Sequence, residues 1–199
     1  MKKNKNDLVS LETRKKLITI ARRHFSTYGY DKTSLEAVVK EANMTRGAIY
    51  HHYKNKKSIF LAVLNQVQTE VGENVEKEAM KSEDVWEQLI FGCVGFVESA
   101  TMKSNKRILL IDSLNVVEWD EWRKMDNENS VSLLKEQLEI VKDKDKLVDL
   151  DIDLIVHMIS GALNDLSLYL ADIETLSKSQ IYKSISHLLK GFEKDVKKI

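Results

Sequence analysis

The sequence contains no proline, only seven glycines and a single cysteine among its 199 residues. Proline and glycine are the commonest helix breakers and the residues on which tight hairpin turns depend. Their scarcity argues against a fold rich in hairpins and favours long, uninterrupted helices. Hydrophobic residues make up 43% of the chain, which is enough apolar material for a buried core. We therefore predict an all-α globular protein.

Other absences concern the compartment. The single cysteine, Cys93, cannot form a disulfide within the chain, and the opening MKKNKNDLVS is basic and polar, without the apolar segment of a secretion signal. No uncharged apolar run approaches the roughly 20 residues of a membrane span, because Asp112, Asp153 or His157 interrupts the longest apolar patches. We expect a cytoplasmic protein with no membrane partner.

The net charge of zero conceals an uneven distribution. Residues 1–57 hold 14 lysines and arginines against 5 acidic residues, a net of +9, and residues 58–199 hold 17 against 26, a net of −9. Such asymmetry is typical of a small module for a polyanion attached to a larger body with another task. The alternative, a merely solvated lysine-rich surface, is left open by charge alone.

The basic segment predicts a supporting helix followed by two short helices. Apolar residues recur at helical spacing between Leu11 and Tyr28, and Gly29 then stands where a helix can end in a left-handed residue. Thr33-Ser34-Leu35-Glu36 has the form of a capping box, with the Thr33 hydroxyl as the predicted cap of a second helix. Asn43-Met44-Thr45 interrupts that helix, and a third begins at Arg46. This arrangement is that of a helix-turn-helix.

The third helix, TRGAIYHHY, has the composition of a recognition helix. Gly47 and Ala48 let its backbone approach a duplex, and Thr45 and Arg46 supply donors for base edges and phosphates. Tyr50 and His51 lie one turn further on the same exposed face, whereas Ile49 and Tyr53 turn inward. Lys56, at the start of the next helix, is placed to hold a phosphate. Each of these residues alone could be a core or solvated surface residue, but their combination favours a DNA-binding helix.

Residues 17–64 resemble the N-terminal domain of the tetracycline-repressor (TetR) family of bacterial transcription regulators. The shared features are Tyr28-Gly29-Tyr30, the Thr33-Ser34 helix start, the Thr45-x-Gly47-x-Ile49-Tyr50-x-His52-Tyr53 segment and the following Lys56. Asn43 stands where the family often has glycine, and asparagine tolerates the same left-handed backbone. The candidate operator-contacting residues are Thr33, Ser34, Thr45, Arg46, Gly47, Ala48, Tyr50, His51 and Lys56.

The rest of the chain predicts a helical body. An apolar stripe starting at Phe60 predicts that the helix beginning near Lys56 runs on towards Met80, and further helices are expected near 83–100, 105–117 and 120–142. We expect about nine helices in two domains: a helix-turn-helix domain over residues 1–57, joined by a continuous helix to an effector-binding and dimerisation domain over residues 58–199.

The last two predicted helices carry broad apolar stripes, which favour burial in a homodimer. A recognition helix reading a palindrome also needs a twofold partner, and the family resemblance implies dimerisation through the last two helices. Packing within the chain's own core is the alternative. The candidate interface residues are Ile155, Ile159, Leu163, Leu166, Leu170, Ile181, Ile185, Leu188 and Phe192.

The sequence says least about which ligand the C-terminal domain binds. Aromatic residues and methionines suit an apolar cavity, although at helical spacing they also suit a plain core. The candidate cavity residues are Phe91, Phe96, Met102, Trp119, Trp122, Met125 and Met158. His157 lies on a predicted interface helix, where we expect a hydrogen-bonded interior polar group, and Cys93 has no histidine or second cysteine nearby in sequence, so we expect no metal site.

Three functions compete. The first is a dimeric repressor released from a palindromic operator when a small apolar or amphipathic ligand binds the body. The second is a DNA-binding regulator whose body binds a protein partner and has a filled core. The third is an enzyme, against which stands the absence of a phosphate loop, a nucleophile elbow, HExxH or clustered Cys and His. We expect no cofactor and no catalytic residue.

Overall fold

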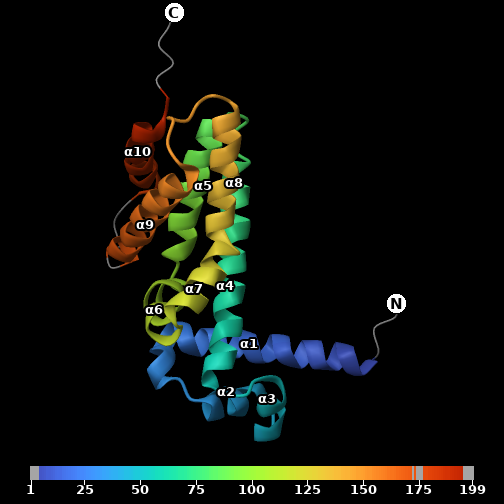
Figure 1. Ribbon diagram of the computed structural model, residues 1–199. Helices are drawn as coiled ribbons and strands as arrows, with labels where there is room; N and C mark the ends of the chain where they lie inside the picture. Colours follow the sequence, from blue (N-terminus) through green and yellow to red (C-terminus); the bar gives the residue numbers. More distant parts are fainter. Residues whose placement is uncertain (1–4, 172, 174–176, 195–199) are drawn as a thin grey trace, which may run out of the picture. The chain divides into compact units, whose positions relative to one another are not determined.

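The computed structural model describes residues 5–171, 173 and 177–194, and in these residues it is all-helical, as predicted (Figure 1). Ten α-helices occur in the described residues, with one π-helical turn (η1) and one 3-10 turn (η2). Their bounds are α1 Lys5–Lys32, α2 Leu35–Ala42, α3 Arg46–His52, α4 Lys56–Ala79, α5 Val85–Ala100, η1 Arg107–Asp112, α6 Ser113–Val116, α7 Trp119–Asn127, α8 Ser130–Asp143, α9 Ile152–Ala171, α10 Lys178–Leu189 and η2 Lys190–Phe192.

Two predicted helices differ from the structure. The helix expected over 120–142 is two helices, because the backbone of Asn129 leaves the helical region (φ −125°, ψ −109°) and its side-chain amide donates to the Met125 carbonyl. This local hydrogen bond gives the chain an alternative to the helical ladder. The helix expected over 105–117 begins as the π-helical turn η1 and continues as the short α6.

The first compact unit comprises the chain up to Val67 together with residues 103–118. Its core contains three rings at close range: Phe60 lies 5.1 Å, centroid to centroid, from both Phe25 and Tyr30, edge to face in each case. Such pairs add specific geometry to the burial of apolar area. The rings join α1 to the start of α4.

Residues 103–118 belong to this unit through polar contacts with α1. The Arg22 guanidinium donates to the Asn105 side-chain oxygen at 2.8 Å, and the Tyr30 backbone N–H donates to the Asp112 carboxylate at 2.8 Å. Burial raises the pKa of Asp112, and that hydrogen bond opposes the shift. The division expected at residue 57 therefore differs from the compact unit, which draws in a segment distant in sequence.

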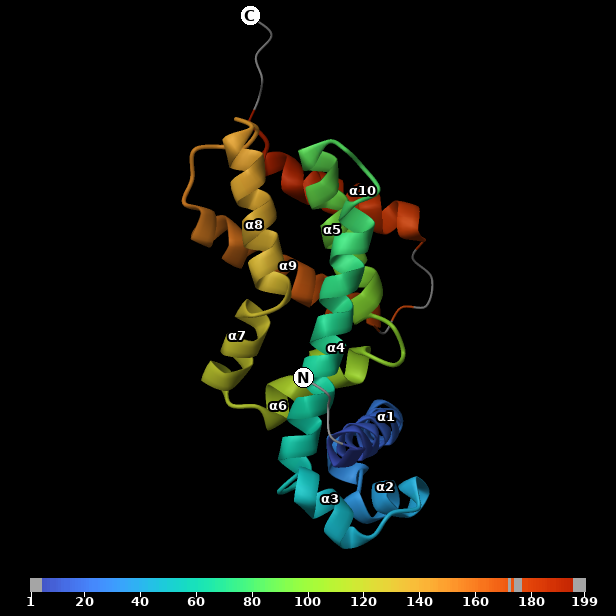
Figure 2. The same ribbon diagram turned by 90° about the vertical axis from the view of Figure 1, so that its right-hand side faces the viewer.

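The second unit comprises residues 68–102 and the chain from Trp119 onward. In it α5 packs against α8, α9 and α10 (Figure 2). Apolar residues of these four helices form one core cluster. The helices start at well-formed caps: the Asp84 carboxylate accepts from two backbone N–H groups at the start of α5, and Ser177 with Gln180 forms a capping box at α10.

The helix α9 has the length and hydropathy of a membrane span, although the core helix of a soluble protein passes the same test. The structure accounts for this composition. Ile155, Ile159 and Leu163 on one side of α9 are buried in the core cluster. Leu154, Met158 and Tyr169 are also apolar and are exposed. The exposed side of α9 therefore carries apolar residues beside the polar Asp153, His157 and Asp165, and only the opposite side is covered by its own chain.

Candidate nucleic-acid interface and ligand cavity

The turn between α2 and α3 is formed by capping residues. The Ser34 hydroxyl accepts from the Ala37 backbone N–H at the start of α2, and Asn43 ends that helix in the left-handed region (φ 54°, ψ 44°). The Thr45 hydroxyl then accepts from the Ala48 N–H and begins α3. Asparagine adopts a left-handed backbone at less cost than most residues, which explains its place here.

The capping assignment of Thr33 is wrong. Its side chain is buried, and its hydroxyl donates to the Gly29 carbonyl at 2.8 Å, so Ser34 is the cap. Gly29 has a positive φ of 83° and interrupts the helical backbone of α1. The Thr33 hydroxyl secures the carbonyl next to this kink. In this conformation Thr33 presents no group to a duplex, while Ser34 is exposed.

One side of α3 faces outward. Thr45, Arg46, Gly47 and His51 are exposed, Ala48 is partly buried, and Tyr50 is 46% exposed. Ile49 and Tyr53 are buried, as the sequence predicted. A Cβ built on Gly47 would meet only the Thr45 hydroxyl, at 3.9 Å, so no other residue that the structure describes blocks a close approach at this position. This geometry suits insertion into a major groove.

Two cations beside this surface already have partners. The Arg46 guanidinium donates to the Glu36 carboxylate at 2.5 Å, with both side chains largely exposed. The Lys56 ammonium donates to the Asp31 carbonyl at 3.1 Å and lies 4.4 Å from the centre of the Tyr30 ring. Lys56 is half-buried, and the Asn55 side chain caps the Ser58 N–H at the start of α4. Arg46 is thus the more accessible of the two charges.

The second unit contains a cavity of about 310 Å³, within the range of small-molecule sites. Its walls come from α4, α5, α7, α8 and α9 and are mostly apolar, including Val75, Leu89, Phe96, Leu134 and Leu163. Cys93 also lines it, and burial raises the pKa of this thiol to about 12, so it is a neutral wall at physiological pH.

The structure brings only Phe96 of the predicted ligand residues to this cavity. Phe91 instead packs against Tyr182, with ring centroids 5.5 Å apart, and Trp119 stacks on Trp122 at 5.4 Å. Met102, Trp119 and Met158 are exposed, and Trp122 and Met125 are partly buried outside the cavity. The predicted set does not describe this cavity, because aromatic and methionine content does not report which side of a helix faces a void.

The predicted dimer residues mostly lie inside the chain's own core. Ile155, Ile159, Leu163, Leu170 and Ile185 are buried in the core cluster, and Leu166, Ile181 and Phe192 pack against it. Leu188 is exposed. The exposed side of α9 carries a second set of apolar residues at helical spacing, which was not among the predicted interface residues: Leu154, Met158 and Tyr169. Gly161, whose added Cβ would meet nothing within 4 Å, and the charged Asp165 lie between them.

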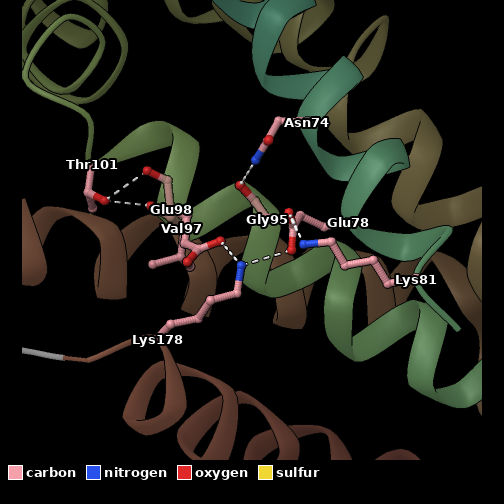
Figure 3. A network of polar contacts seen from close by, with 8 residues as sticks. All are labelled: Asn74, Glu78, Lys81, Gly95, Val97, Glu98, Thr101 and Lys178. Carbon is pink, nitrogen blue, oxygen red and sulfur yellow. Dashed lines mark hydrogen bonds and ion pairs between the residues drawn. The ribbon is translucent and has the colours of Figure 1, made fainter.

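A polar network joins three of the helices of the second unit (Figure 3). The Lys178 ammonium, at the start of α10, donates to Glu78 of α4 at 2.9 Å and to Glu98 of α5 at 2.6 Å. Burial raises the pKa of Glu78, but the hydrogen bonds from Lys81 and Lys178 outweigh it and bring the pKa below its usual value. The adjoining Asn74 amide donates to the Gly95 carbonyl, which fixes α4 against α5 beside the cavity.

Comparison with known proteins agrees with this geometry. Residues 86–192 match the family model of the tetracyclin repressor-like C-terminal domain, and residues 17–63 match that of bacterial regulatory proteins, tetR family. The HTH-type transcriptional regulator AcrR of Shigella flexneri is 33% identical over 100 residues, which cover 50% of this chain and 46% of that protein. The chain thus spans about half the length of this curated relative, and it spans 28% of the length of another, the HTH-type transcriptional repressor Rv1474c of Mycobacterium tuberculosis.

Solved structures are similar over nearly the whole chain. A TetR-family transcriptional regulator from Pectobacterium atrosepticum is 26% identical, with 94% of both chains covered and a TM-score of 0.73. A fatty acid degradation regulator, FadR, from Bacillus halodurans shares the fold at 17% identity, with 95% of this chain and 96% of that one covered and a TM-score of 0.77.

Proposed function

This chain belongs to the tetR family of bacterial regulatory proteins, and we propose that it is a homodimeric repressor that leaves its operator when a small apolar or amphipathic molecule occupies the cavity. The observation that carries the proposal is the outward side of α3, where Arg46, Gly47, Tyr50 and His51 are exposed over a buried Ile49. DNA-binding regulation is the function of the relatives.

Operator contact is assigned to the exposed residues of the predicted set. Thr45, Arg46, Gly47, Ala48, Tyr50 and His51 would enter the groove or meet its edges, and Ser34, at the start of α2, would meet a phosphate. Lys56 contributes a positive potential near the DNA, although its ammonium also holds the Asp31 carbonyl. Thr33 supports the fold around Gly29 and leaves the contact set.

Dimerisation is assigned to the uncovered side of α9. Leu154, Met158 and Tyr169 are 60%, 49% and 64% exposed, and exposed apolar residues grouped on one side of a helix are typical of an interaction surface. A second copy is the occupant, because an isologous contact buries the same stripe on both protomers and supplies the twofold axis that a palindromic site needs. Leu188 of α10, from the predicted interface set, is also exposed.

The release mechanism is a population shift between conformers with different spacing of the two α3 helices. Residues 103–118, which hydrogen-bond α1, are joined in sequence to α5 at one end and α7 at the other, and both of these helices line the cavity. A ligand that moves α5 or α7 therefore pulls on a segment anchored to the DNA-binding unit. The cavity also supports a small-molecule ligand over a filled body that binds only a protein partner.

The test starts from a duplex selected by the wild-type chain from a random library. Tyr50→Ala should weaken binding to that duplex about 10- to 100-fold in fluorescence anisotropy, because a good base-edge contact is worth about 1–3 kcal/mol. Tyr28→Ala is the matched control, since Tyr28 is equally exposed but lies on α1. Equal affinities for wild type and Tyr50→Ala, with helical content unchanged, would remove α3 from the interface.

A further inference from the structure

The cavity has an uneven distribution of charge. Three carboxylates from three helices line it: Glu76 of α4, Asp126 of α7 and Glu136 of α8. Among the described residues that line it there is no lysine, arginine or histidine. Two of the amides that line it are engaged with each other and with the backbone, because Gln137 donates to the Val85 carbonyl and to the Gln88 side-chain oxygen. The cavity thus combines apolar walls with negative charge alone.

Asp126 is the most deeply placed of these carboxylates. Glu76 and Glu136 are exposed, whereas Asp126 is partly buried, and within the described residues its carboxylate has no ion-pair partner. Burial raises the pKa of Asp126 to about 6. At neutral pH it is therefore ionised in surroundings that solvate it poorly, and a charge in that position is costly until an opposite charge approaches.

Anions, neutral apolar molecules and organic cations would interact differently with a cavity that has apolar walls and acidic residues. An anion would meet three carboxylates, and like charges in a partly desolvated site repel strongly. A neutral apolar molecule would contact the apolar walls, but it would displace water from the Asp126 carboxylate and offer no hydrogen bond or charge in its place. An organic cation would fill the same walls and neutralise the buried charge, while Glu76 and Glu136 at the edge attract it from solution.

We propose that the effector of this cavity is an amphipathic organic cation, with an aromatic or alkyl body against Leu89, Phe96 and Leu134 and its cationic group against Asp126. The inference rests on the proposed function, in which the cavity is the effector site. It adds the charge of the effector and names Asp126 as the residue that selects for it.

The experiment compares two molecules of nearly the same shape. Phenyltrimethylammonium carries a positive charge, and tert-butylbenzene replaces its nitrogen by carbon and is neutral. Isothermal titration of the full chain at pH 7.5 should give an affinity at least about tenfold higher for the cation. Asp126→Asn should abolish the difference between the two, and Asp120→Asn, on the same helix but outside the cavity, should leave it unchanged.

The pH dependence provides a second measurement. The titratable groups around Asp126 are Glu76 of α4, Cys93 of α5 and Glu136 of α8, and α9 contributes only Ser160, Leu163 and Asn164. Cys93 stays neutral throughout the range. Cation affinity should fall as the pH drops through about 6, where Asp126 takes up a proton, and this fall should be absent in Asp126→Asn.

The outcomes separate the inference from its premise. Equal binding of the two probes, or a preference that survives in Asp126→Asn, would overturn the charge assignment and leave the cavity as an effector site. Binding of neither probe would overturn the effector role of the cavity along with the inference. Operator binding measured on the same samples without either probe does not involve the cavity, so a failure there is a failure of the proposed DNA-binding function and not of the charge assignment.

Discussion

The helices α3 and α9 are both amphipathic in sequence, yet their functional sides differ in how they could be identified. In α3 the buried side is marked by Ile49 and Tyr53, and the remaining positions are polar or small, so burial of one side leaves the other as the candidate interface. In α9 the exposed side also carries apolar residues, mixed with Asp153, His157 and Asp165. Ile155 is fully buried, and its neighbour Leu154 is 60% exposed.

The difference shows what a hydrophobic stripe does and does not indicate. A period of 3.6 residues predicts a helix and one side that avoids water, but it does not say which neighbour covers that side. When only one side is apolar, its neighbour is the chain's own core. When both sides carry apolar residues, as in α9, the packing of the chain decides which side stays exposed for a partner. In α9 the broader apolar stripe is the buried one.

The largest expected effect concerns the inner side of α9. In a Met158→Glu background, where the proposed dimer is dissociated, Ile155→Ala should lower the free energy of unfolding in urea by about 2–5 kcal/mol, because it leaves a cavity in the core. Leu154→Ala in the same background should cost less than about 0.5 kcal/mol, since its side chain is exposed. Equal costs for these two neighbours would mean that the sides of α9 are misassigned.

The next effect concerns the outer side. Met158→Glu places a charge in the proposed twofold contact and should weaken the dimer at least about 100-fold, because a buried unpaired charge costs several kcal/mol. Sedimentation equilibrium should show the monomer at micromolar concentration, and operator affinity should fall in parallel. Leu114→Glu, at an exposed apolar position of α6, is the control. A Met158→Glu chain that remains dimeric would exclude this surface as the interface.

The smallest expected effect concerns the ion pair between Arg46 of α3 and Glu36 of α2. Glu36 accepts from Arg46 in the DNA-free protein, and it adds a negative charge beside the proposed interface. Glu36→Gln should raise operator affinity about two- to fivefold at low salt. In the variant Arg46 has no ion pair with Glu36 to break before it binds a phosphate. The remote Glu139→Gln removes the same charge from α8 and should change nothing. A lower affinity in Glu36→Gln would indicate that Glu36 positions Arg46 for the duplex.

Much of the first unit could be predicted from local residues. The Asn43 turn, the Thr45 cap and the burial of Ile49 depend on neighbours within a few positions in sequence, and short-range preferences are enough to specify them. The Thr33 assignment was wrong because Ser34 competes for the same cap, and a single threonine offers two hydrogen-bonding choices. The contact of residues 103–118 with α1 had no local signal.

The sequence by itself determined an all-helical chain, a basic head with an outward α3 and membership of a family of regulators. Those properties follow from composition, helical period and a contiguous motif, all of which act over a few turns of helix. Only the tertiary structure decided which side of α9 is bare, that Phe96 alone of the predicted residues lines the cavity, and that Asp126 reaches it. Each depends on how helices far apart in sequence pack together, and a periodic pattern is the same whichever neighbour covers it.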